Sequence, residues 1–348
     1  MDDWPMLAVF LVASAAAEPR RRAAATADHE FGTWSQGEQD RRLMRIFRTL
    51  GLQHRGSFVE FGYFARQGSN TENLERRGWD GFRMDGWNND KSAKCHRVGW
   101  ISSKNIVELF RRFSAPVNVT YVSIDLDSSD LWIMKALLSA EFRPAVISIE
   151  YNSNFPYGYP LAFPDVLNTM PTRYVGWDKG CYMASSAHAI EVAAREFGYV
   201  VVDIEPGYDL FLVRAELWGK RPVPDLAASR MLYRPFNIGF WLNGQKGKDY
   251  PKHTAMHPNR QAQYLDYSVY QETGSLVAAR RQAAGYFERF RKDRLPCFMN
   301  TTCAVETLVL CKHLNSYLCP TSAGTDPCAP YPPSSSEFPL KPFPASTR

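Results

Sequence analysis

Residues 58–86 read FVEFGYFARQGSNTENLERRGWDGFRMDG, and this stretch decides the fold. An apolar run at 57–61 predicts a short strand that ends in a glycine turn. A polar loop follows, then a helical run at 72–77 and a second predicted strand at 81–84, which ends in Asp85. Strand, glycine turn, helix, strand and acid is the plan of a nucleotide-binding βαβ unit.

The turn after the first strand carries the residue types that such a unit uses. Glu60 and Gly62 form a Glu-x-Gly turn, and Asp85 stands 25 residues after Glu60. A carboxylate at about this spacing meets the ribose hydroxyl groups of a bound nucleotide. The dinucleotide pattern G-x-G-x-x-G is absent, because Arg66 and Gln67 occupy the loop where more glycine is expected.

Composition places the chain among globular proteins. It has 348 residues, of which 45% are hydrophobic and 14% aromatic, and its formal net charge is +5. This length allows one large core or two small ones. No long Lys/Arg block with interleaved aromatic residues occurs in the sequence, so nucleic-acid binding is not expected.

The N-terminal segment predicts targeting. Residues 4–17 are apolar or small, and arginines occupy 20–22. The apolar run is too short to span a bilayer, so no stable membrane span is expected, and the alanines at 15–17 suit signal cleavage. We therefore expect a signal peptide and a secretory or secreted protein. The acidic start leaves a bipartite organelle-targeting segment, or a buried or disordered N-terminus, open.

Cysteines and sequons also favour the secretory route. Cys95 and Cys181 stand singly, and five more cluster near the end of the chain: Cys297, Cys303, Cys311, Cys319 and Cys328. Their gaps are too wide for C-x-x-C zinc pairs, which favours two disulfides with one thiol left over. Sequons at Asn118 and Asn300 predict a glycoprotein.

The chain divides into four expected parts. Residues 1–32 are the targeting segment, 33–218 an α/β domain, 219–319 an extension with a helix and the cysteine cluster, and 320–348 a disordered tail rich in Pro and Ser. In the second part strand-like and helix-like runs alternate, which predicts an open α/β sheet with helices on both faces.

Hydrophobic periodicity locates the other elements. Further strands are predicted at 119–126, 145–151, 199–203 and 209–213, and helices at 36–50, 105–113, 131–138, 185–197 and 276–291. Ser102 and Ser103 are the expected cap of the helix at 105–113.

Acidic residues follow the predicted strands. Ligands bind beyond the carboxyl ends of the strands in open α/β sheets. The residues there are Glu60, Gly62, Asp85, Asp125, Asp127, Glu150 and Asn152. Five carboxylates on one edge would repel one another without a ligand, a metal or hydrogen bonds, which makes this edge a candidate site.

A series of fragments resembles one known family. The fragments are EFG, GSNTENLERRGWDGFRMDG, VSIDLDSSDLWIMKAL, VISIEYN, ASSAHAIEVAAREFGY and DLFLVRAEL. In this order they look like the FkbM-related methyltransferases, over roughly 58–217. The resemblance implies an S-adenosylmethionine-dependent enzyme with the Rossmann-like class I fold, an open and mostly parallel seven-stranded sheet.

The resemblance also implies roles for individual residues. The cofactor-binding set would be Glu60, Gly62, Gly68, Ser69 and Asn70 in the loop, Asp85 at the ribose, and Ser102 and Ser103 where the adenine packs. The catalytic set would be Asp125 and Asp127, facing the methyl sulfonium and the substrate, with Glu150 and Asn152 lining the substrate side.

Methyl transfer asks mainly for proximity and alignment of the two reactants. Asp125 or Asp127 could also accept a proton from the acceptor. The acceptor, a small molecule or a glycan, would present a hydroxyl, carboxyl or amine group.

Two alternatives stay open. Asp125-x-Asp127 could hold Mn²⁺ and a nucleotide sugar, which would make the chain a lumenal glycosyltransferase, and this pair is the one possible metal site. The chain could instead be a non-catalytic secreted protein on a methyltransferase fold, with Arg66 filling the cofactor loop.

Overall fold

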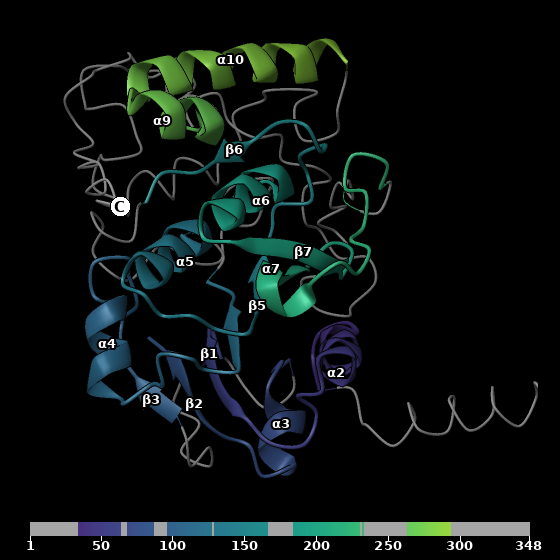
Figure 1. The fold of residues 1–348 in the computed structure, drawn as a ribbon. Coiled ribbons are helices and arrows are strands. Elements are labelled where there is room, and N and C mark those ends of the chain that lie inside the picture. Colours follow the sequence, from purple (N-terminus) through teal and green to yellow (C-terminus); the bar gives the residue numbers. More distant parts are fainter. Residues whose placement is uncertain are drawn as a thin grey trace, which may run out of the picture.

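The fold is a layered α/β structure, shown in Figure 1 as a computed structural model. The structure describes residues 34–63, 68–86, 96–126, 129–165, 184–229, 232 and 263–293. The predicted targeting segment, Asp127, all seven cysteines, the sequon at Asn300 and the Pro/Ser-rich tail lie outside the described residues.

Seven strands form the main sheet, in the order β3-β2-β1-β4-β5-β8-β7. They are β1 (Ser57–Phe61), β2 (Asp80–Asp85), β3 (His96–Val98), β4 (Tyr121–Ile124), β5 (Val146–Glu150), β7 (Tyr199–Ile204) and β8 (Asp209–Arg214). The first five in this order are parallel, and β8 pairs antiparallel with both β5 and β7. The predicted α/β class with a mostly parallel sheet is confirmed.

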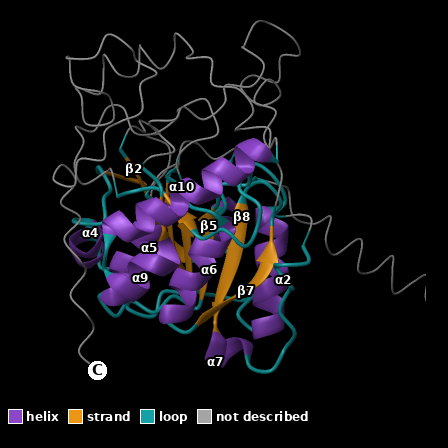
Figure 2. Ribbon diagram, turned by 90° about the horizontal axis from the view of Figure 1, so that it is seen from above, coloured by secondary structure: helices purple, strands orange, loops and turns teal. Residues whose placement is uncertain are grey.

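Helices cover both faces of this sheet. They are α2 (Gln39–Leu50), α3 (Glu72–Arg76), α4 (Ile106–Arg112), α5 (Asp130–Ser139), α6 (Ala187–Glu196), α7 (Ala215–Trp218), α9 (Tyr267–Thr273) and α10 (Leu276–Lys292). Apolar side chains of α4, α5 and α6 pack in one core cluster, and those of α2, α3 and α7 pack in a second. Figure 2 shows α5 and α6 on one side of the strands and α2 on the other.

The sheet face under α2 and α3 is apolar at one end and polar at the other. Phe58, Tyr121 and Val146 are register partners on neighbouring strands and belong to the core cluster under α2. Because side chains alternate along a strand, the residues two positions later face the same way. These are Glu60, Ser123 and Ser148, all buried. The carboxyl half of this face is therefore a buried polar layer.

The described part of the C-terminal extension belongs to the same core. A small second sheet pairs β6 (Leu161–Ala162) antiparallel with β9 (Leu265–Asp266). The ring of Phe155 contacts those of Tyr264 and Phe287, with ring centroids 5.1 and 6.2 Å apart. Figure 1 shows α9 and α10 as a further layer above α6. No helix among the described residues is both long and apolar enough to cross a membrane.

Arg83 holds the polar layer from β2. Its side chain is 0% exposed, and its guanidinium lies 3.3 Å from the carboxylate of Glu60 and 3.5 Å from that of Glu72, and it also pairs with Glu75. Burial alone would lower the pKa of Arg83, but the charges of Glu60 and Glu75 outweigh it and raise the pKa. A buried charge needs such partners, because an isolated one costs many kcal/mol.

We predict that Arg83→Met destabilises the protein by about 3 kcal/mol or more, because it leaves buried carboxylates without their cation. The control is Arg55→Met, which breaks a pair with Asp80 whose side chains are 79% and 82% exposed. That variant should lose less than about 1 kcal/mol. Urea unfolding measures both, and equal losses would contradict the prediction.

Candidate functional site

The carboxylate of Glu60, in β1, holds the loop that follows this strand. This carboxylate is 4% exposed. It accepts hydrogen bonds from the Ser69 hydroxyl and the Asn70 backbone N–H, each at 2.7 Å, and from the Thr71 hydroxyl. With Arg83 also donating, at 3.3 Å, both carboxylate oxygens are used inside the protein. Glu60 therefore shapes the loop that Gly68, Ser69 and Asn70 form.

Contacts with other parts of the fold also hold this loop. Gly68 forms a parallel bridge with Ser35, which precedes α2. The side-chain amide of Asn70 donates to the Ser123 hydroxyl at 3.0 Å and to the Asp209 carboxyl at 3.3 Å. The loop is thus tied to the segment before α2 and to strands β4 and β8.

The order of the strands reverses between β1 and β4, which is where open α/β sheets bind ligands. Gly62 follows β1 and has a φ of +75°, a backbone conformation that favours glycine. A Cβ atom at Gly62 would lie 1.6 Å from the backbone oxygen of Asp125, which follows β4. Only glycine therefore fits at position 62, because two backbone segments lie in close contact where the strand order reverses.

Three of the predicted acids end neighbouring strands at this edge. Asp85 ends β2, Asp125 follows β4 and Glu150 ends β5, and all three are half-buried. Because Ile124 pairs with Ile149, Asp125 and Glu150 continue side by side from adjacent strands. Asp127, the second acid of the predicted pair, lies outside the described residues.

Asn152 organises the turn that leaves β5. Its backbone N–H donates to the oxygen of Ser185 at 2.8 Å. Its side-chain oxygen accepts from the backbone N–H and the side-chain amide of Asn154, at 3.0 and 2.9 Å. The hydrogen bond to Ser185 thus joins the turn after β5 to the residues that precede α6.

Ser102 and Ser103 do not cap a helix as predicted. α4 begins at Ile106, and Asn105 is its N-cap residue. The side-chain oxygen of Asn105 instead accepts from the backbone N–H of Ser102 at 2.8 Å, so the two residues close a turn before the helix. The Ser103 hydroxyl donates to Asp165, a buried carboxyl that follows β6.

Asp165 is one of two described acids with a raised pKa that the sequence reasoning missed. Burial raises its pKa to about 6, against hydrogen bonds from Ser103 and Ser129 and the charge of Lys104, which lower it. No strand end marks this acid in the sequence, since β6 has two residues. Tertiary packing alone brings it to the serines.

Asp209 is the other missed acid. Burial raises its pKa to about 7, against the hydrogen bond from Asn70, while Glu205 and Asp130 raise it further. Asp209 begins β8. Because β8 runs antiparallel, its first residue lies at the edge where the parallel strands end. A hairpin between β7 and β8, marked by Pro206-Gly207, was the signal that could have located it.

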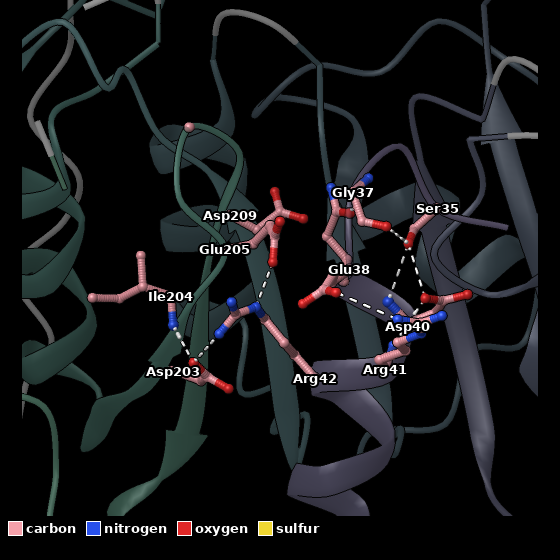
Figure 3. A network of polar contacts seen from close by, with 12 residues as sticks. Ser35, Gly37, Glu38, Asp40, Arg41, Arg42, Asp203, Ile204, Glu205 and Asp209 are labelled. Atoms are coloured by element: carbon pink, nitrogen blue, oxygen red, sulfur yellow. Dashed lines mark hydrogen bonds and ion pairs between the residues drawn. The ribbon is translucent and has the colours of Figure 1, made fainter. Parts of the chain in front are cut away.

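A network on α2 borders Asp209, as Figure 3 shows. Arg42 pairs with Asp203 at 2.7 Å and also with Glu205. A Cβ atom at Gly37 would come within 2.7 Å of the Glu205 carboxylate. The segment before α2 therefore lies directly on the β7–β8 turn. Within the described ranges, no group of three or more His, Cys, Asp or Glu side chains could hold a metal ion.

Comparison with known proteins identifies no family. No protein-family model and no curated protein matches the chain. Among solved structures, it is similar to a protein described as "Putative hemolysin from Streptococcus thermophilus", with 12% sequence identity and a TM-score of 0.32. The match covers 58% of this chain and 74% of that one, and a likeness at this level carries no argument about function.

We predict that Gly62→Ala destabilises the protein by about 2–4 kcal/mol, because it adds a clash with a backbone oxygen to the strain of a positive φ. The matched control is Gly78→Ala, since Gly78 has a φ of +76° and no atom within 4 Å of its added Cβ. That variant should lose about 1 kcal/mol. Unfolding free energies test the difference, and two equal values would refute the close contact.

Proposed function

We propose that the chain is an S-adenosylmethionine-dependent methyltransferase of the Rossmann-like class I type, as the resemblance to the FkbM-related enzymes implies. One observation carries the proposal. The sheet has the order of a nucleotide-binding sheet through its first five strands, with a firmly held loop after β1 and an acid at the end of adjacent β2.

The residues at this edge fit such a cofactor. Asp85 would accept hydrogen bonds from the two ribose hydroxyls, and the segment at Ser102 and Ser103 would border the adenine. The turn at Gly62 and the loop at Gly68 and Ser69 would bind the amino-acid part of the cofactor. Glu60 would act on the cofactor only through the loop, since its oxygens already accept from the loop and from Arg83.

When bound, the cofactor supplies a methyl group already activated by a positive sulfur. The protein then has to align the acceptor and remove its proton. Asp125 and Glu150 come from adjacent strand ends, and either could accept a proton from a hydroxyl or amine group. Asn152, Asp125, Glu150 and, outside the described residues, Asp127 are the proposed catalytic set.

We predict that the full-length protein binds S-adenosylhomocysteine and that Asp85→Ala weakens this binding about 10- to 100-fold, the usual value of charge-assisted hydrogen bonds to two hydroxyls. Asp80→Ala is the control, because Asp80 lies at the opposite end of the same strand and its side chain is 82% exposed. Isothermal titration measures the Kd of each protein.

The same titration separates the competing functions. Equal affinity of the wild type and Asp85→Ala for S-adenosylhomocysteine would show that Asp85 does not bind the ribose. No heat with the wild type would refute the cofactor and favour a non-catalytic protein. Mn²⁺-dependent binding of a UDP-sugar, without binding of S-adenosylhomocysteine, would favour the glycosyltransferase that Asp125-x-Asp127 suggests.

A further inference from the structure

Asp209 is a buried acid that the proposed chemistry does not use. Its carboxyl is 3% exposed and lies under the loop after β1, where the side-chain amide of Asn70 donates to it at 3.3 Å. Asn70 is itself buried, and its backbone N–H is held by Glu60 at 2.7 Å. The loop thus covers Asp209, and Asn70 is the residue that joins the two.

Other acids face Asp209 from the elements packed against it. They are Glu205 from the β7–β8 turn, Asp130 from α5 and Glu150, its register partner on β5. Gln39 of α2 hydrogen-bonds the Asp209 carboxyl, and Tyr121 of β4 is close enough to feel its charge. Asn70 links it further to Ser123 of β4 and Glu60 of β1. Arg42 of α2 pairs with Asp203 and with Glu205, the acid in the turn beside Asp209. The charged groups that face Asp209 are therefore mainly acids, and Asn70 and Gln39 are its hydrogen-bond partners.

We propose that Asp209 is a positioning residue for the loop Gly68–Thr71: its ionisation releases the loop and its protonation keeps the loop closed. The reason is hydration. An ionised carboxylate enclosed by protein and by other acids gains most by admitting water. Asn70 joins the loop to Asp209, so lifting the loop there would admit water to the carboxylate.

The direction follows from linkage. In the closed loop, burial raises the pKa of Asp209 from 3.8 to about 7. In an open, hydrated state the pKa returns toward its ordinary value, so opening releases a proton between these two values. Rising pH therefore favours opening: between these two values the opening constant grows by about tenfold for each pH unit, and above the closed-state pKa it levels off.

Hydrogen exchange of the full-length protein tests this without any cofactor. Corrected for intrinsic exchange, the protection of the Asn70 and Thr71 amides should fall about tenfold from about pH 5 to about pH 6 and should level off above about pH 7. Asp209→Asn keeps the shape of the side chain but cannot ionise. In that variant, the protection of both amides should stay constant over the same range.

Two control variants guard against other causes. Asp165→Asn removes the other buried acid with a raised pKa, which lies against Ser103 and away from the loop, and should keep the wild-type exchange profile. Asn70→Ala cuts the link and should expose the Thr71 amide at every pH, which tests the proposal even if Asp209→Asn does not fold. A wild-type profile without pH dependence, or one that Asp209→Asn retains, overturns the proposal.

The consequence for binding rests on the proposed function. If the loop binds the cofactor, the affinity for S-adenosylhomocysteine should fall as pH rises toward about 7 and level off above it in the wild type, and stay level in Asp209→Asn. Absence of binding at every pH would refute the cofactor alone, because the exchange measurement would still decide the role of Asp209. A fall in affinity of the same size in both proteins would count against Asp209.

Discussion

The buried carboxylate of Glu60 determines how the site is built. It stands at the end of β1 with almost no access to water, so its charge has to be met by the protein. Arg83 meets it from β2, and Ser69, Asn70 and Thr71 meet it from the loop. Because these donors come from the loop that follows the strand, satisfying one acid also fixes the conformation of the loop.

The two faces of the sheet therefore differ in polarity. The face under α4, α5 and α6 is an apolar core, whereas the face under α2 and α3 turns polar toward the carboxyl ends of its strands. The polar layer lies directly beneath the loop. A change of charge in that layer, as at Asp209, is thus next to the loop and is not screened by water.

Several local elements were predicted correctly from the sequence. The strand at 57–61 and the helix at 276–291 were predicted within one residue of β1 and α10. The strand is an apolar run that ends in a glycine turn, and the helix has clear periodicity and begins at a serine cap. β3, with three residues, and the pair β6 and β9, with two each, are too short for periodicity to reveal. Ser102 and Ser103 looked like a cap, but Asn105 takes that place, since the serines close the preceding turn.

The sequence by itself determined the α/β class and put acids and a glycine at strand ends: Glu60, Gly62, Asp85, Asp125 and Glu150. It could do so because the alternation of strand-like and helix-like runs, and the turn residues between them, are local properties of the chain. Only the tertiary structure decided which neighbours those acids have. It paired Glu60 with Arg83, which is 23 residues away, and Asn70 with Asp209, which is 139 residues away. Contacts at such separations depend on strand order and direction, and the spacing of residues along the chain does not encode them.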